Sequence, residues 1–198
     1  MRKNTLLLFI SIFVLLFGQT AIAQTPVPMA SQPGLTYSED FADIANWTNN
    51  FASGIGANRW LGFAANATGT IPDGVRTTVS TLVFQGTSTS GGVQRGGLAG
   101  SNNPAGTIVL LSTGGTSNTS ACAIEVFLDF TGTTAGLIGF DWTRVNNSTG
   151  DRGGSVRVYT STDGTTYTEL TGAAVNNVIN NGGTASGSIT NVQLPASF

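Results

Sequence analysis

The sequence predicts an all-β protein, more specifically a jelly-roll-like antiparallel β-sandwich. Three observations lead to this prediction. The chain is rich in threonine and contains 27 glycines, and both residue types are poor helix formers. Short runs rich in Val, Ile, Phe and Thr recur between clusters of Gly, Asn and Ser, as in antiparallel sandwiches. No convincing stretch has the apolar period of a helix.

The first residues have the layout of a secretory signal peptide. Arg2 and Lys3 precede the apolar run Leu6–Phe17, and the small-residue sequence Ala-Ile-Ala then forms a cleavage site. We therefore expect residues 1–23 to be removed on export, which makes the protein secreted or bound at the cell surface. We expect no membrane insertion after cleavage, because no later segment approaches the roughly 20 apolar residues of a membrane helix.

The charge of the exported chain argues against two classes of partner. Without Arg2 and Lys3, six basic residues remain against ten acidic ones, a net charge of about −4, and no lysine is left. Nucleic acids and anionic membrane surfaces need clustered positive charge, so we expect neither as a partner. Cys122 is the single cysteine, so we expect a buried thiol and no internal disulfide.

Two segments follow the signal peptide. Residues 24–35, "QTPVPMASQPGL", contain three prolines and no apolar period, which predicts an extended linker. Residues 36–198 are then expected to form one β-sandwich module. Its expected strands lie in "LTYSEDF", "RWLGFAA", "TTVSTLVFQ", "GTIVLLS", "ACAIEVFLDF", "AGLIGFDWTRV", "GSVRVYTS", "TTYTEL" and "GSITNVQL".

The middle strands alternate between apolar and polar residues, which assigns their two faces. The expected core faces carry Ile124, Val126, Leu128 and Phe130, then Ile138, Phe140 and Trp142, then Val156 and Val158. If these strands are neighbours in one sheet, their opposite sides form a polar face. That polar face would carry Glu125, Asp129, Asp141, Thr143, Arg157 and Tyr159.

The stretch "STDGTTYTEL", residues 161–170, predicts a hairpin turn. The dipeptide Asp163-Gly164 tolerates positive φ angles and lies between two strand-like runs. A sialidase-type repeat, S-x-D-x-G-x-T-W, would place its glycine two residues after the aspartate and end in tryptophan. Here Gly164 follows Asp163 directly and Tyr167 ends the run, so a turn accounts for the sequence.

Three stretches resemble jelly-roll modules of secreted Bacteroidetes-type proteins. They are "YSEDFADIANW", "FLDFTGTTAGLIGFDWTRVNNSTGDRGGSVRVYTSTDGTTYTEL" and "SGSITNVQLP", and the resemblance covers roughly residues 36–198. Such modules are carbohydrate-binding or adhesin-like sandwiches, and they often precede a C-terminal sorting signal for the type nine secretion route. They usually close with a strand that nothing here matches, so the resemblance implies a module that lacks its last strands.

The resemblance also raises the question of a structural calcium ion. Similar carbohydrate-binding jelly rolls hold calcium between an acid of the first strand and an aspartate of the last. Glu39 and Asp40 match the first half of such a site. The second half would be missing from this sequence, and plain exposed acids are the alternative interpretation of both residues.

The residue inventory removes most catalytic chemistry. The chain has no histidine, which excludes Ser-His-Asp and Cys-His arrangements and the commonest zinc ligand. Paired carboxylates remain, but Glu125 and Asp129 lie about 13 Å apart along an extended strand. Asp141 on an adjacent strand could approach either of them. Pairing of an acid with Arg157 across two strands explains these charges more simply, so we expect no enzyme.

Carbohydrate binding needs an aromatic ring beside planar polar groups. Asp141, Arg157, Tyr159 and Phe127 could supply these groups, with Trp47 and Trp60 as alternatives if they lie on loops. We therefore expect a non-catalytic extracellular module that binds a polysaccharide or a cell-surface ligand. The alternatives are a purely structural spacer of a larger adhesin and an accessory or catalytic domain of a polysaccharide hydrolase.

Overall fold

The computed structural model describes residues 25–44, 59–65, 79–82, 92–97, 104–111, 121–144, 153–164, 166–179 and 185–198. In these ranges the chain is strand-rich and contains no α-helix, so the all-β prediction is confirmed at this level. Three short 3₁₀ turns lie wholly within these ranges. No helix in the described ranges has the length and apolar character needed to cross a membrane. The predicted signal peptide lies outside these ranges.

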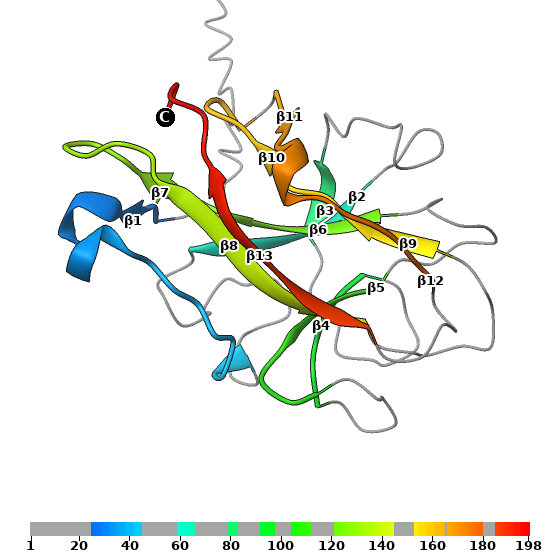
Figure 1. Ribbon diagram of the computed structural model, residues 1–198. Coiled ribbons are helices and arrows are strands. Elements are labelled where there is room, and N and C mark those ends of the chain that lie inside the picture. Colours follow the sequence, from blue (N-terminus) through cyan, green and yellow to red (C-terminus); the bar gives the residue numbers. More distant parts are fainter. Residues whose placement is uncertain are drawn as a thin grey trace, which may run out of the picture.

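The strands are short and lie in the order shown in Figure 1. The strands are β1 (Val27–Pro28), β2 (Trp60–Ala65), β3 (Val79–Leu82), β4 (Gly92–Arg95), β5 (Ile108–Leu111), β6 (Ala121–Val126), β7 (Leu128–Asp129), β8 (Leu137–Thr143), β9 (Gly153–Val156), β10 (Tyr159–Thr160), β11 (Thr168–Glu169), β12 (Val175–Ile179) and β13 (Ser186–Gln193). The 3₁₀ turns are η1 (Met29–Ser31), η2 (Pro33–Leu35) and η4 (Thr171–Ala173).

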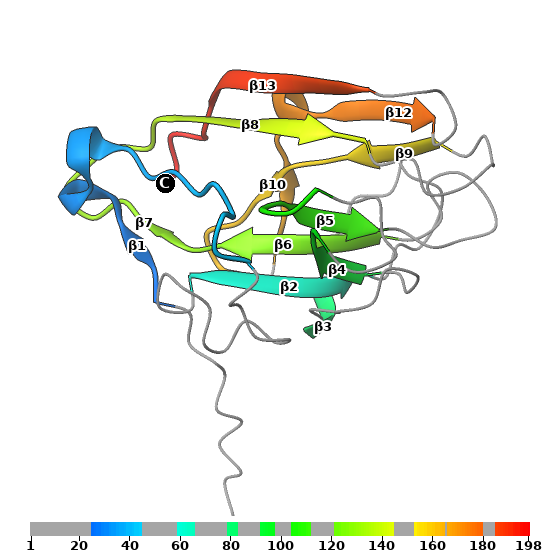
Figure 2. The same cartoon turned by 90° about the horizontal axis from the view of Figure 1, so that it is seen from below.

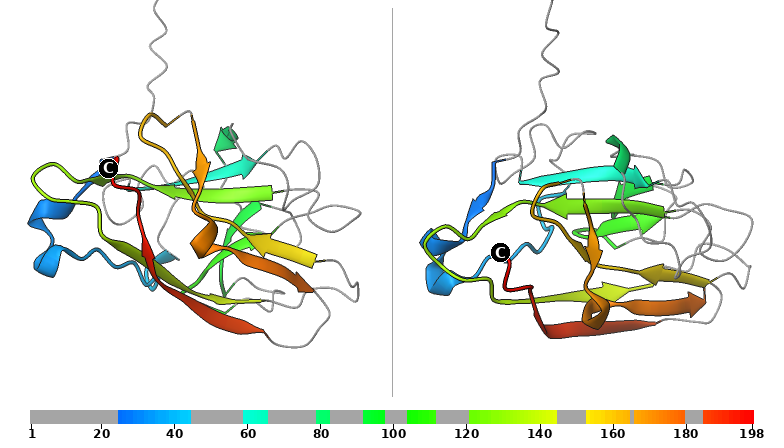
Figure 3. Two further views of the ribbon diagram at one scale, coloured as in Figure 1. Left: turned by 45° about the horizontal axis from the view of Figure 1, so that its top comes forward. Right: turned by 90° about the horizontal axis from the view of Figure 1, so that it is seen from above.

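The strands form small and mostly antiparallel sheets. A three-stranded sheet has the order β3-β2-β6, and the pairs β4-β5, β8-β13, β9-β12 and β10-β11 are also antiparallel. The pair β1-β7 is parallel. Figures 2 and 3 show β8, β13, β9 and β12 on one side of the molecule and β2 and β6 on the other.

The pair β8-β13 bears out the alternation predicted for this stretch. Ile138, Phe140 and Trp142 are half-buried, while the residues between them are exposed. The register shifts between Ile189 and Val192, where Asn191 has a φ of 56°. Opposite this shift the strands approach closely, because a Cβ added at Gly139 would lie 2.8 Å from the carbonyl oxygen of Ile189. Glycine is therefore required at this point of β8.

A buried apolar cluster joins β4 to the segment that ends at Ile44. Ile44 and Val93 are 1% and 0% exposed and form its centre. Partly buried side chains pack against them, namely Phe41, Trp60, Ile108, Cys122 and Ile124. The predicted core role of Ile124 is thus confirmed, and Cys122 is half-buried against the same cluster.

Residues 27–35 differ from the expected extended linker. Val27 is fully buried, and its backbone N–H donates to the carbonyl oxygen of Phe127 at 2.8 Å. Met29 is buried as well, and η1 contacts β7. Pro28 is the last residue of β1 and Pro33 is the first residue of η2, and both positions tolerate the missing backbone N–H of proline. Val27 and Met29 therefore pack against the fold, whereas η2 has no buried residue.

Candidate functional site

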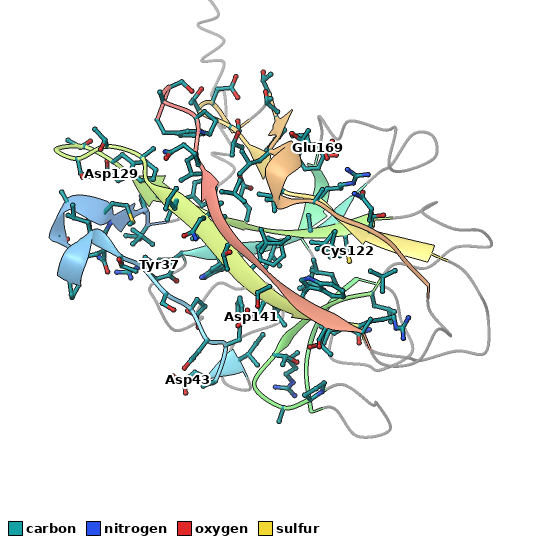
Figure 4. The ribbon with its side chains drawn as sticks, viewed as in Figure 1. Tyr37, Asp43, Cys122, Asp129, Asp141 and Glu169 are labelled. Atoms are coloured by element: carbon teal, nitrogen blue, oxygen red, sulfur yellow. The ribbon has the colours of Figure 1, made fainter. Side chains whose placement is uncertain are left out.

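The predicted polar face is not assembled in the structure. It required β6, β8 and β9 to be neighbours, but β6 pairs with β2, β8 with β13 and β9 with β12. Figure 4 shows Asp141 on β8 at a distance from Glu169 of the β10-β11 hairpin. The residues predicted from the sequence therefore lie in separate parts of the fold.

Asp141 lies on the exposed face of β8. Its carboxylate oxygen Oδ1 accepts a hydrogen bond from the hydroxyl of Ser188 at 2.5 Å, and the two residues are directly opposed in the β8-β13 register. Thr143 is exposed on the same face and is opposed to Ser186. This face is polar as predicted, but its partner strand is β13.

Arg157 and Tyr159 lie at the base of the β10-β11 hairpin. The Arg157 Nη1 atom is 2.7 Å from Glu169 Oε1, and the two side chains are only 14% and 17% exposed. Tyr159 is the register partner of Glu169 and is half-buried. Arg157 therefore does pair with an acid, but the acid is Glu169 and not one of the three carboxylates that this pairing was expected to explain, namely Glu125, Asp129 and Asp141. This ion pair leaves little of either charge available to a ligand.

Phe127 lies between the end of β6 and the start of β7, and it is half-buried. Its backbone N–H donates to the carbonyl oxygen of Arg59 at 3.4 Å, and its own carbonyl accepts from Val27. The backbone of Phe127 thus connects β2 to the N-terminal segment.

Glu39 and Asp40 shape a tight turn. Glu39 Oε1 accepts the backbone N–H of Phe41 at 2.9 Å, and Asp40 Oδ1 accepts that of Ala42 at 2.9 Å. Phe41 has a φ of 55°. Within the described ranges, no group of three or more His, Cys, Asp or Glu side chains could hold a metal ion. Each acid therefore has a local structural partner in this turn.

An aromatic and polar cluster forms where this turn meets the start of β2. We call it the Tyr37 cluster, and its members are Tyr37, Glu39, Phe41, Arg59 and Trp60. The indole Nε1–H of Trp60 donates to the Tyr37 hydroxyl oxygen at 2.8 Å. The Tyr37 hydroxyl donates to Glu39 Oε2 at 3.3 Å. This chain of hydrogen bonds fixes the two aromatic rings relative to the carboxylate.

Two further contacts complete the Tyr37 cluster. The guanidinium carbon of Arg59 lies 6.0 Å from the centroid of the Tyr37 ring, at the outer limit of a cation–π contact. Phe41 packs edge-on against Trp60, with ring centroids 5.5 Å apart. Arg59 Nε is buried and has no hydrogen-bond partner among the described residues. All five residues are half-buried, so each keeps some contact with solvent.

The surroundings of Tyr37 keep its hydroxyl protonated. Burial raises the pKa of Tyr37 above its ordinary value of 10.0, and the negative charge of Glu39 raises it further. The hydrogen bond from Trp60 and the positive charge of Arg59 lower it, but the net direction is upward. The Tyr37 hydroxyl therefore remains a neutral donor and acceptor at physiological pH.

The carboxylates considered for hydrolysis have separate partners. Glu125 on β6 accepts a hydrogen bond from the Tyr167 hydroxyl at 3.1 Å, and burial raises its pKa. Asp129 is exposed and accepts the Thr131 N–H at 2.8 Å, and its hydrogen bonds from Thr131 lower its pKa. In the described part of the chain, neither carboxylate hydrogen-bonds to Asp141.

The stretch "STDGTTYTEL" forms the predicted turn between β10 and β11. Gly164 has a φ of 69°, and its N–H donates to the Ser161 hydroxyl at 2.9 Å. Asp163 Oδ1 accepts the Thr166 N–H at 2.7 Å. These local bonds are those of an Asx-stabilised turn, so the prediction of a turn is confirmed.

Of the Tyr37 cluster, only Glu39 and Trp60 were candidates from the sequence, and they were assigned to different sites. Tyr37, Phe41 and Arg59 were not predicted. Tyr37, Glu39 and Phe41 do alternate at the period of an extended strand, which assigns them to one side. Their partners lie 23 residues further on, and no local pattern connects the two segments. The predicted alternative Trp47 lies outside the described residues.

A scan against protein-family models finds no match, and neither the search of curated proteins nor that of solved structures finds one.

Proposed function

We propose that the chain is a non-catalytic extracellular module that binds a glycan at the Tyr37 cluster. The observation that carries this proposal is the hydrogen-bond chain from Trp60 through Tyr37 to Glu39, with the Arg59 guanidinium beside it. Sugar rings stack on aromatic side chains, and their hydroxyl groups exchange hydrogen bonds with planar polar groups. The Tyr37 cluster supplies both kinds of group in one place.

The chemical capacity left in the cluster fits hydroxyl groups of a sugar. The guanidinium of Arg59 carries N–H donors on its two Nη atoms besides the buried Nε, and the carboxylate of Glu39 keeps acceptor positions beyond its bonds to Phe41 and Tyr37. The aromatic rings are held by neighbours, so little side-chain entropy is lost on binding. A ligand with alternating donors and acceptors can use both polar groups.

The proposal also includes the setting of the module. Export is supported by the charged and apolar start of the sequence, and a polysaccharide ligand by the resemblance to secreted jelly-roll modules. A jelly-roll-like antiparallel sandwich is supported by the antiparallel pairs on two sides of the molecule (Figure 2). We infer a role in attachment to polysaccharide or to a cell surface.

Affinity electrophoresis against a panel of soluble polysaccharides tests this function. We expect the wild type to bind at least one of them and the variants Tyr37→Ala and Arg59→Gln to bind about tenfold more weakly, a change that corresponds to about 1.4 kcal/mol of binding free energy. Asp141→Asn serves as a control on β8, and circular dichroism checks that each variant is folded.

Three other results of this binding test would contradict the proposal or move the binding site. A wild type that binds no polysaccharide contradicts the proposal and favours the structural spacer. Binding that is lost in Tyr159→Ala and kept in Tyr37→Ala moves the site to the base of the hairpin. Shortening of the polysaccharide during incubation contradicts the non-catalytic assignment.

A further inference from the structure

The Tyr37 cluster contains a positive charge that no acid of the described ranges neutralises. The guanidinium of Arg59 lies over the Tyr37 ring, with its central carbon 6.0 Å from the ring centroid. No carboxylate oxygen in the described part of the chain comes within 4.0 Å of it, whereas Arg157 Nη1 lies 2.7 Å from Glu169 Oε1. Arg59 is half-buried, so water screens its charge less than it screens an exposed charge.

The guanidinium of Arg59 also keeps hydrogen-bonding capacity for a ligand. Its Nε atom is buried and has no hydrogen-bond partner among the described residues. The two Nη groups form no hydrogen bond or ion pair with a described residue either, but they are not buried as Nε is. They are therefore the part of the side chain that a ligand can reach. Their N–H bonds form a planar fork that matches the two oxygens of a carboxylate.

The acid of the same cluster has other hydrogen-bond partners. Glu39 Oε1 accepts the backbone N–H of Phe41 at 2.9 Å, and Glu39 Oε2 accepts the Tyr37 hydroxyl at 3.3 Å. The carboxylate of Glu39 therefore lies at the hydroxyl end of Tyr37, while the guanidinium of Arg59 lies over the ring. This arrangement leaves the Nη groups of Arg59 available to an external anion.

We propose that the ligand of the Tyr37 cluster contains a uronic acid, an acidic sugar whose carboxylate pairs with the Nη groups of Arg59. This inference rests on the proposed glycan-binding function and names the class of sugar that the site takes. A uronic acid carries its carboxylate on the sugar ring, so a ring stacked on an aromatic side chain holds the carboxylate at the edge of the stack. The guanidinium over Tyr37 meets it there in a charge-assisted, bidentate contact.

The net charge of the exported chain means that such a preference depends on local groups. Once Arg2 and Lys3 are removed with the expected signal peptide, the chain carries a net charge of about −4. A polyanion is therefore repelled by the chain as a whole. Tighter binding of an acidic sugar than of its neutral counterpart has to come from a cation at the binding site.

Matched pairs of ligands test the proposal on the intact chain. Oligosaccharides of polygalacturonate and their methyl esters share the same rings and ring hydroxyl groups, but only the first carry carboxylates. Oligosaccharides of alginate and their methyl esters form a second pair with different uronic acids. Carrageenan oligosaccharides are anionic through sulfate groups, so they separate a preference for carboxylates from a preference for any anion. Isothermal titration calorimetry at constant ionic strength, with a chelator present to prevent bridging by calcium, gives each Kd.

We expect the chain to bind at least one uronic acid ligand about tenfold more tightly than the methyl ester of the same ligand. Arg59→Gln should abolish this preference, because the amide carries no charge. Arg59→Lys should keep part of it, since the charge remains while the planar fork is lost. Arg144→Gln removes the same charge just after the end of β8 and should leave the preference unchanged. Circular dichroism checks that each variant is folded.

The remaining outcomes separate this inference from the proposed function. The uronic acid assignment is overturned by equal binding of acid and ester, by binding of carrageenan in place of the uronic acid ligands, or by a preference that survives in Arg59→Gln. Glycan binding itself stands in each of these cases. Binding of a neutral polysaccharide, without affinity for either uronic acid ligand, has the same meaning. A chain that binds no polysaccharide at all contradicts the proposed function.

Discussion

Trp60 donates its indole N–H to the hydroxyl oxygen of Tyr37 at 2.8 Å, and this bond connects two segments 23 residues apart. The Tyr37 hydroxyl donates in turn to the carboxylate of Glu39, which also accepts the backbone N–H of Phe41. The N-terminal turn and strand β2 therefore share one polar network beside the buried cluster. Most of the proposed binding chemistry depends on this junction.

Tyr37→Phe should lower the free energy of unfolding by about 1–2 kcal/mol, because it keeps the ring but leaves the Trp60 N–H without its acceptor. Urea denaturation followed by tryptophan fluorescence measures the effect. Ser188→Ala, which removes a hydrogen bond at an exposed site, is the matched control and should change stability by less than about 1 kcal/mol. Equal effects of the two substitutions would contradict the assigned role of Tyr37.

The Arg157–Glu169 ion pair should show strong coupling, since both side chains are largely buried. Arg157→Met should destabilise the protein by about 2–3 kcal/mol, because it leaves the Glu169 carboxylate without its partner. The double variant Arg157→Met/Glu169→Met should be less destabilised than this single one. A double-mutant cycle in urea measures the coupling, and additive effects would mean that the pair is not formed in solution.

Gly139→Ala should destabilise the β8-β13 pair by about 1–3 kcal/mol, because the new Cβ would lie 2.8 Å from the Ile189 carbonyl oxygen. Gly136→Ala provides the matched control, since a Cβ there meets nothing within 4 Å. Thermal unfolding of both variants measures the difference in Tm. A similar Tm for the two would show that β13 is not seated against Gly139.

Gly164→Ala should cost about 1–2 kcal/mol, because its φ of 69° lies in the left-handed region although no atom obstructs the side chain. Gly164→Asn should cost less, since asparagine tolerates this conformation better than alanine does. Chemical denaturation of the two variants makes the comparison. The reverse order of stability would rule out a strained backbone as the reason for glycine in this turn.

The stability of the chain should depend on pH through Glu125, whose pKa in the folded state is raised above its ordinary value of 4.5. The folded state then binds a proton more tightly than the unfolded state. Its contribution to stability is fully present below about pH 4.5 and is lost as the pH rises through the raised pKa. The free energy of unfolding, compared between wild type and Glu125→Gln across this range, measures it. A difference that does not vary with pH would refute the expectation.

Sequence reasoning succeeded where the cause is local. The alternation of Ile138, Phe140 and Trp142 predicted which side of β8 is covered, because side-chain direction in a strand has a period of two. Asp163-Gly164 predicted the hairpin turn, because only a few residue types accept the backbone angles found there. The positive charge of Arg157 predicted an acidic partner, but the acid is Glu169 and not Glu125, Asp129 or Asp141, because strand pairing rather than local sequence decides which acid lies opposite.

The sequence by itself thus determined the strand-rich character of the chain, the turn at Gly164 and the two sides of its best alternating strand. Only the tertiary structure decided that β8 pairs with β13, that Val27 and Met29 are buried against the fold, and that Tyr37 meets Trp60. The physical reason is that backbone preference and side-chain period act within a few residues. Strand pairing and the Tyr37 cluster depend instead on contacts between distant segments, whose free energies arise only when the whole chain is folded.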